Sequence, residues 1–118
     1  YYYQPTVLTE VSADMDVMQE ESFGPIIGIQ KVSNYAEALA AMNQSRYGLT
    51  ASVFCKSEDR ALKILADLEA GSAYWNCCDR VSPNLPWTGW KDSGLGSTLG
   101  HDGIRAFLQP KGWHLRRS

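Results

Sequence analysis

The sequence predicts a single α/β domain built on parallel strands. Short runs of apolar and β-branched residues alternate with two segments whose apolar residues recur at helical spacing. Strands that alternate with helices of about 10–15 residues are typical of βαβ units, in which neighbouring strands run parallel. The length of 118 residues fits one domain. A hydrophobic share of 44% beside a charged share of 20% is typical of a folded protein rather than a disordered one.

The first quarter of the chain is expected to hold two strands separated by a helical turn. Residues 1–11 are rich in β-branched and aromatic side chains and are predicted to be extended. Residues 14–23 mix acidic residues with methionine and valine, which favours a short helical turn that ends at Gly24. Residues 26–32 form an almost unbroken apolar run, which predicts a strand covered on both faces.

A first amphipathic helix is predicted after this strand. Ser33 or Asn34 can cap its N-terminus, and Glu37 stands in its first turn. Its apolar face consists of Tyr35, Ala38, Leu39 and Met42. Gly48 is expected to stop the helix, and only glycine fits there at little cost if the residue is left-handed. Residues 49–54 are predicted to form the next strand.

A second amphipathic helix follows with the same signals. Ser57 is its predicted N-cap, and acidic residues come directly behind it. Its apolar stripe consists of Ala61, Ile64, Leu65 and Leu68. Gly71 is expected to end the helix, and residues 72–78 are predicted to form the third strand.

The character of the chain changes after residue 78. Residues 79–100 contain two prolines and four glycines, and this predicts a loop far longer than the usual connection of about 4–6 residues. Three tryptophans lie in or beside it, namely Trp75, Trp87 and Trp90. We therefore expect an ordered, functional loop rather than a disordered one. A short helix over residues 102–108 and an extended segment over residues 111–116 are predicted to follow.

Composition and charge exclude two classes of function. Lys and Arg number 11 against 13 Asp and Glu, so the net charge is −2 and the cationic patches of nucleic-acid-binding proteins are not expected. No apolar run approaches the roughly 20 residues that a membrane-spanning helix needs. No signal peptide is visible, and the chain begins with Tyr1 rather than Met, which suggests a fragment or a processed product.

The cysteines indicate a reducing compartment. The odd set of Cys55, Cys77 and Cys78 does not form the regular spacing of a disulfide framework, so a cytoplasmic location is predicted. No CxxC or HxxxH pattern occurs among three cysteines and two histidines. A metal site is therefore not expected.

Six short motifs then point to one family. They are PTVL at residues 5–8, EESFGP at 20–25, YGL at 47–49, Gly71, Asn76, and PWTGWKDSG at 86–94. In order and spacing they resemble the C-terminal part of an NAD(P)-dependent aldehyde dehydrogenase, whose corresponding motifs read EE-x-FGP and PFGGYKxSG. The resemblance covers nearly the whole chain, and six motifs in register are more specific than any one of them.

The resemblance implies a fold and an assembly. Residues 1–109 would form part of a catalytic domain, a partial three-layer α/β structure with a parallel sheet and flanking helices. Residues 110–118 would form the C-terminal strand of an oligomerisation arm. The implied partners are other copies of the chain in a homo-oligomer and an aldehyde substrate in the complete enzyme, with neither nucleic acid nor a membrane.

The resemblance also implies where the chemistry takes place. In the family a Cys thiolate attacks the aldehyde, hydride passes to the nicotinamide, and a Glu activates the water that hydrolyses the thioester. Both residues correspond to positions upstream of this segment, so no catalytic residue is predicted here and the chain alone is expected to be inactive. The cofactor would be NAD or NADP in the complete enzyme, without tight binding to this chain by itself.

Two residues match positions that contact the cofactor in the family. By resemblance, the Glu21 carboxylate would accept hydrogen bonds from the nicotinamide ribose, and the Phe23 ring would pack near the nicotinamide. A carboxylate that only accepts hydrogen bonds suits a diol with two donors. Composition alone favours a helix-terminal acid and a core phenylalanine, and the motif reverses that preference for Glu21.

Four residues are predicted to line the substrate mouth, namely Cys78, Asp79, Val81 and Trp87. Trp87 falls where the family has an aromatic against the aldehyde, and the alternative is a side chain that packs the loop onto the sheet. Cys77 and Cys78 have no basic neighbour or nearby His, so a nucleophilic role is not expected. Lys91 has two interpretations, a donor to backbone carbonyls or a solvated charge, of which the second is preferred.

Two other classes of function stay open. The chain can be a free-standing, non-catalytic domain that oligomerises, because a cut sheet exposes edge strands that pair with another copy. It can also be a ligand-binding domain that uses the tryptophan-rich loop. The first predicts a stable homo-oligomer, and the second predicts ligand-dependent quenching of Trp87 or Trp90 fluorescence.

Overall fold

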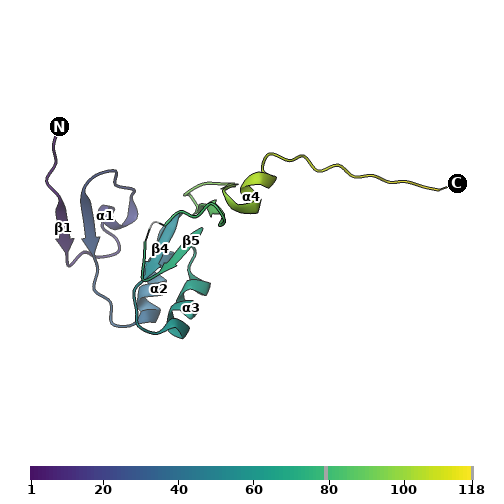
Figure 1. Cartoon of the computed structure of the whole chain (residues 1–118). Helices are drawn as coiled ribbons and strands as arrows, with labels where there is room; N and C mark the ends of the chain where they lie inside the picture. The colour runs from purple at the N-terminus through teal and green to yellow at the C-terminus, as the bar shows by residue number, and fades with distance from the viewer. Residues whose placement is uncertain (79, 118) are drawn as a thin grey trace.

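The computed structural model of the chain describes residues 1–78 and 80–117, as drawn in Figure 1. The helices are α1 (Asp16–Gln19), α2 (Tyr35–Gln44), α3 (Glu58–Asp67) and α4 (Gly100–Arg105). The strands are β1 (Thr6–Thr9), β2 (Ile26–Ile29), β3 (Tyr47–Gly48), β4 (Thr50–Val53), β5 (Ser72–Trp75), β6 (Trp87–Thr88), β7 (Trp90–Lys91) and β8 (Ser97–Thr98). None of the helices in this described part is long and apolar enough to cross a membrane.

The strands form two-stranded sheets, and the longer ones are parallel. β1 pairs with β2 in parallel, with Thr6 opposite Ile26, and β4 pairs with β5 in parallel, with Thr50 opposite Ser72. β3 pairs with β7 and β6 pairs with β8, both antiparallel. The predicted α/β class with parallel strands is confirmed. Within the described residues, however, the strands do not join into one continuous sheet.

The β1–β2 sheet is covered on one face only. A Cβ on Gly28 would meet Val11 and Met18, so this side of the sheet packs against α1 and the segment before it. Ile27 and Ile29 on the other side are exposed. The prediction of a strand covered on both faces is therefore wrong for the chain by itself. In the described part, β1 and α1 make the main contacts to β2, and Ile27 and Ile29 on its second face stay exposed.

The two longer helices begin at the predicted caps. Asn34 Oδ1 accepts a hydrogen bond from the Glu37 backbone N–H at 3.0 Å, and the Glu37 carboxylate accepts one from the Ser33 N–H at 2.7 Å. Ser57 accepts a bond from the N–H of Arg60 in the same way at the start of α3. The side chains of Asn34 and Ser57 thus satisfy N–H groups in the first turn that a helix cannot satisfy internally.

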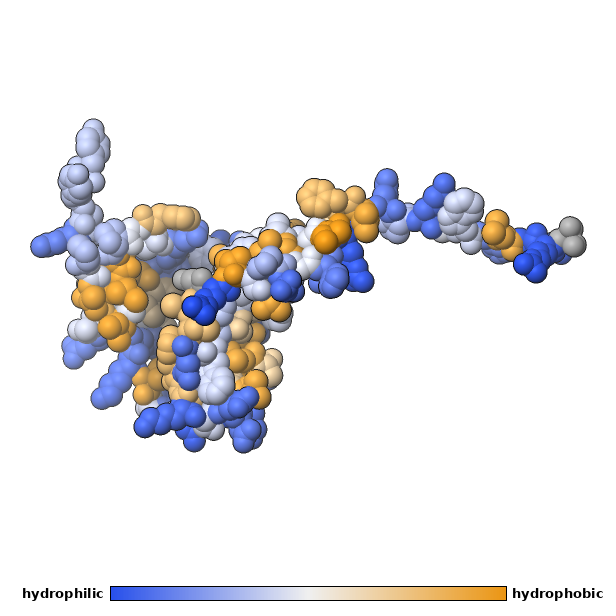
Figure 2. All heavy atoms as spheres, viewed as in Figure 1, coloured by the Kyte–Doolittle hydropathy of each residue, from blue (hydrophilic) through white to orange (hydrophobic). Residues whose placement is uncertain are grey.

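Little of the chain is buried. In the described part, the buried apolar residues are Val11, Ala61 and Leu68, and the last two belong to the predicted stripe of α3. The accessible surface is 10044 Å², whereas a compact protein of this mass exposes about 6,400 Å². The radius of gyration is 19.1 Å, whereas a compact domain of this length has about 13.5 Å. Figure 2 shows apolar side chains gathered on the open surface of the N-terminal strands and along α4.

Several boundaries differ from the predictions, and β2 and β5 end at Ile29 and Trp75, before the predicted residues 32 and 78. α2 ends at Gln44, with Ser45 extended after it, and Gly48 is a buried strand residue that is not left-handed. Glycine is needed there because the Glu69 carbonyl fills the space that a Cβ would take. The predicted long loop contains the short strands β6, β7 and β8, and α4 begins before the predicted helix. The chain after α4 runs away from the body as an extended tail, as predicted (Figure 1).

Candidate functional site

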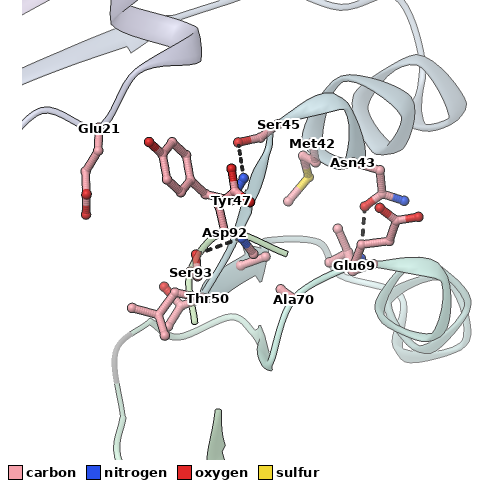
Figure 3. A pocket seen from close by; sticks show the side chains of 14 residues that line it. Glu21, Met42, Asn43, Ser45, Tyr47, Thr50, Glu69, Ala70, Asp92 and Ser93 are labelled. Atoms are coloured by element: carbon pink, nitrogen blue, oxygen red, sulfur yellow. Dashed lines mark hydrogen bonds between the residues drawn. The ribbon is translucent and has the colours of Figure 1, made fainter. Parts of the chain in front are cut away.

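A cavity of about 490 Å³ lies where four segments of the chain meet. Figure 3 shows Glu21 entering it from the segment after α1, apart from the other labelled residues. The segment from the end of α2 through β3 to the start of β4 contributes Met42, Asn43, Ser45, Tyr47, Gly48, Leu49, Thr50 and Ala51 to the lining. The turn before β5 and the segment after β7 add Leu68, Glu69, Ala70, Asp92 and Ser93.

Glu21 provides a hydrogen-bond acceptor at this cavity. It follows directly after Glu20, the C-cap of α1, and its side chain is exposed. A carboxylate there accepts hydrogen bonds and cannot donate them when ionised. Phe23, the second predicted cofactor contact, is 95% exposed and is not among the lining residues of this cavity. The structure thus brings Glu21 to a cavity and leaves the Phe23 ring free on the surface.

A second wall of the cavity, formed around β3, is held in place by hydrogen bonds from the segment after β7. The Ser93 hydroxyl accepts a hydrogen bond from the Gly48 N–H at 2.9 Å, and the Asp92 N–H donates to the Arg46 carbonyl at 3.0 Å. The Arg46 guanidinium pairs with the Asp92 carboxylate, with 2.7 Å between Nε and Oδ2. This hydrogen bond raises the pKa of Arg46, because it favours the charged form of the guanidinium.

Lys91 does not line the cavity itself, but it bonds to three residues that do. Its Nζ donates to the carbonyl oxygens of Asn43 at 2.6 Å and Ser45 at 2.9 Å, and lies 2.6 Å from Glu69 Oε2. Its side chain is 25% exposed, and its backbone is left-handed with φ at 53°. The preferred interpretation of Lys91 as a solvated charge is therefore wrong, and the alternative of a donor to backbone carbonyls is confirmed.

Trp87 lies on a different part of the molecule. It stands in β6 opposite Thr98 of β8 and is half-buried, and it is not among the residues that line the cavity with Glu21. Thr88 next to it donates from its hydroxyl to the Gly96 carbonyl at 2.6 Å. Among the described residues, the predicted cofactor contact Glu21 and the predicted substrate contact Trp87 therefore do not line the same cavity.

The cysteine segment follows β5. Cys77 is half-buried, and Cys78 and Val81 are exposed. Asp79 lies outside the described residues, so its predicted role is not addressed by the structure. Cys55 lies beyond the end of β4 at Val53 and is half-buried. Among the described residues, no group of three or more His, Cys, Asp or Glu could hold a metal ion.

Two polar residues of the site had no signal in the sequence. Asn43 donates from Nδ2 to the Asp67 carbonyl at 2.8 Å and accepts from the Glu69 N–H at 3.0 Å, and this joins the C-terminal ends of α2 and α3. Glu69 then pairs with Lys91. These partners are more than twenty residues apart in the sequence, so no local pattern could have revealed them.

A comparison with protein families decides the relationship. The model of the aldehyde dehydrogenase family matches residues 1–112. The chain belongs to the aldehyde dehydrogenase family. The match includes Glu21, Trp87 and Lys91, which confirms the resemblance drawn from the six motifs and confirms an oxidoreductase family.

Individual relatives agree with this membership. The aldehyde dehydrogenase of Emericella nidulans is 40% identical over 116 residues, which are 98% of this chain and 23% of that protein. The aldehyde dehydrogenase of Paenarthrobacter nicotinovorans is 41% identical over 111 residues, which are 94% of this chain and 24% of that protein. This chain therefore spans about a quarter of the length of these relatives.

Solved structures show the same fold. An NAD-dependent aldehyde dehydrogenase from Sinorhizobium meliloti matches with a TM-score of 0.94 and 37% identity, over 99% of this chain and 24% of that one. Betaine aldehyde dehydrogenase from Staphylococcus aureus in complex with NAD+ matches with a TM-score of 0.89 and 33% identity, over 92% of this chain and 21% of that one. The α/β arrangement of this chain thus matches that of one segment of these enzymes.

Proposed function

We propose that this chain is the C-terminal part of an enzyme that oxidises an aldehyde to a carboxylate with NAD or NADP. The match to the family over residues 1–112 carries this proposal. The geometry supports it, because the EESFGP motif brings the Glu21 carboxylate to a cavity instead of packing it against the body of the chain. The complete enzyme determines which aldehyde is oxidised.

The side chains of Glu21 and Phe23 fit the nicotinamide end of a dinucleotide. The Glu21 carboxylate can accept hydrogen bonds from the two hydroxyls of a ribose. The exposed Phe23 ring offers a flat apolar surface for a nicotinamide ring. When bound, the dinucleotide accepts the hydride of the oxidation. In this proposal Glu21 and Phe23 orient it, and the rest of the enzyme holds its remaining parts.

The substrate contacts of the proposal come from the segment after β5. Cys78, Asp79, Val81 and Trp87 form one wall of the aldehyde tunnel in the complete enzyme. Val81 is 59% exposed and Cys78 is exposed, so both are available to a ligand or to a further part of the protein. Apolar and aromatic side chains of this kind are typical of small-molecule pockets.

The exposed apolar surface supports a role inside a larger protein. Parallel strands are normally buried on both faces, yet Val7, Ile27 and Ile29 are exposed on the β1–β2 sheet. We assign the cover of this surface to the rest of the same subunit, because the relatives are several times longer than this chain. The three cysteines are free, which is the state that a reducing cytoplasm maintains.

The same proposal divides the chain into two functional parts. Residues 1–109 belong to the catalytic domain, and residues 110–118 belong to the strand of the oligomerisation arm, through which the complete enzyme forms a homo-oligomer. The extended, exposed tail after α4 favours this division, because it has backbone groups available for pairing. The same open strands favour the second candidate, a non-catalytic domain that only self-associates.

The nucleophile and the general base lie, in this proposal, in the part of the enzyme outside this chain. The purified 118-residue chain should then form no NADH or NADPH with an aldehyde. Activity that disappears in Cys77→Ser or Cys78→Ser would contradict this assignment. If the complete enzyme carrying either substitution still oxidises the aldehyde, the result would support the assignment.

An exchange of segments tests the proposal directly. Residues 1–118 replace the matching segment of the Emericella nidulans aldehyde dehydrogenase, which is 40% identical there. The control is the same enzyme with the segment deleted. Aldehyde-dependent reduction of NAD or NADP by the exchanged enzyme, and none by the deleted one, is the expected result. A folded exchanged enzyme that binds the cofactor and oxidises no aldehyde would contradict the proposal, whereas a stable oligomer of the isolated chain would favour the second candidate.

A further inference from the structure

We propose that Lys91 is a positioning residue that fixes the wall containing Trp87. The inference rests on the proposed function for the role of Trp87 as a substrate contact. The structural part of the inference rests only on the three bonds that the Lys91 ammonium makes. Among the described residues, the Lys91 ammonium bonds to none of the proposed substrate or cofactor residues, so it would act through the backbone that it holds.

The three donors of the Lys91 ammonium each have one partner. Two are the carbonyl oxygens of Asn43 and Ser45, and the third is the carboxylate of Glu69. Asn43 lies in the last turn of α2 and Ser45 is its C-cap, so these carbonyls belong to a helix end that lacks intrahelical partners. α2 has no basic residue in its own last turn. Lys91 therefore supplies, from 48 residues away, the cation that a helix C-terminus favours.

The bond to Glu69 leads from Lys91 to the loop with Trp87. Glu69 lies two residues before Gly71 in the turn that enters β5. The Thr88 carbonyl lies directly against the Gly71 backbone, at the place where a Cβ would be. Since Thr88 is the neighbour of Trp87 in β6, fixing the turn at Glu69 also fixes the backbone that carries Trp87.

The backbone of Lys91 gives a second connection. Lys91 pairs with Tyr47, and Trp90 pairs with Gly48, in the short β3–β7 sheet. Lys91 also adopts a left-handed conformation, which is unfavourable for a residue with a Cβ. The bonds of the ammonium offset this cost. Both ends of the segment from Trp87 to Lys91 are thus fixed by the same side chain.

The test uses the active enzyme that contains this chain. Lys91→Met removes the donors and keeps an apolar stem, Lys91→Arg keeps the charge with a different donor geometry, and Lys63→Met removes an exposed lysine of α3 as the control. Hydrogen exchange is measured over residues 84–99 and, as a reference, over β1 and β2. The kcat and the KM for the aldehyde and for the cofactor are measured in parallel.

We expect exchange over residues 84–99 to become roughly tenfold faster in Lys91→Met, because each charge-assisted hydrogen bond contributes about that factor. Exchange in β1 and β2 should not change. The KM for the aldehyde should rise in the same variant while the KM for the cofactor and kcat stay within about twofold of the parent, and Lys91→Arg should restore part of the effect. Lys63→Met should behave like the parent.

Two results would overturn the inference. One is a Lys91→Met variant that exchanges like Lys63→Met over residues 84–99. The other is loss of protection throughout the chain, β1 and β2 included, in both Lys91 variants, since Lys91 would then act on global stability. If the parent oxidises no aldehyde, the proposed function fails, and the exchange data still decide the structural role of Lys91.

Discussion

The carbonyl oxygen of Thr88 occupies the space that a side chain on residue 71 would need. This contact brings the turn before β5 against the loop with Trp87, since Thr88 comes seventeen residues after Gly71 in the chain. The Gly71 N–H donates to the Gly48 carbonyl at 3.0 Å, so the glycine is fixed on both sides. A β-carbon at residue 71 can therefore be accommodated only if the backbone moves.

The first prediction follows from this contact. Gly71→Ala should lower the free energy of unfolding by about 1–3 kcal/mol, because it forces a backbone shift in a packed region. Gly112→Ala is the matched control, since no atom lies near the corresponding Cβ position in the tail. Urea unfolding followed by tryptophan fluorescence measures the difference. Equal stability of the two variants would show that Thr88 does not press on Gly71.

The second prediction concerns the N-terminal cap of α2. Asn34→Ala should destabilise the chain by about 1 kcal/mol, because it removes the acceptor for the Glu37 N–H. Ser33→Ala is the control, because Ser33 contributes its backbone N–H to the Glu37 carboxylate and not its hydroxyl. Thermal unfolding by circular dichroism distinguishes the two. A Ser33→Ala variant that loses as much stability as Asn34→Ala would contradict this assignment of the cap.

The third prediction concerns the ion pair between Arg46 and Asp92. Both side chains are more than half exposed, so their coupling in a double-mutant cycle with Arg46→Met and Asp92→Asn should be small and should disappear in about 1 M salt. The pair raises the pKa of Arg46. A raised pKa of a base stabilises the fold below the unfolded-state value and loses this effect only as the pH passes the folded-state value. The Arg46 contribution should therefore be constant from neutral to pH 10.

The fourth prediction concerns the Glu21 carboxylate. In the complete enzyme, Glu21→Gln should raise the KM for NAD or NADP by roughly tenfold, because a charged acceptor of hydrogen bonds becomes a neutral one. Glu20→Gln is the control, since Glu20 is the C-cap of α1 and does not line the cavity. Steady-state kinetics at a saturating aldehyde concentration measures both. The same KM in the two variants would remove Glu21 from the proposed cofactor site.

Local signals in the sequence predicted much of the fold. The caps at Asn34 and Ser57 and the stripe of α3 around Ala61 depend on neighbours within one helical turn, and they were correct. The cover of β2 and the role of Gly48 depend on distant segments. β2 has a neighbour on one face only, and Gly48 is a glycine because of Glu69, so both predictions were wrong.

The candidate site was predictable only where a motif supplied it. Glu21 lies at a cavity, as a cofactor contact requires, and this follows from the EESFGP motif and not from periodicity. The bonds of Lys91 to Asn43 and Ser45 join residues that are 48 and 46 positions apart. No single-sequence pattern encodes such a pairing, because the turn of the backbone between them decides whether the groups meet.

The intact mass of the protein in its natural source, together with its activity, tests the central claim most directly. An antibody against this chain isolates the protein, and mass spectrometry and an aldehyde-dependent NAD(P) reduction assay follow. The account predicts a mass several times the 13.1 kDa of this chain and aldehyde oxidation by the isolated protein. A mass near 13.1 kDa, with a stable oligomer and no aldehyde oxidation, would contradict it.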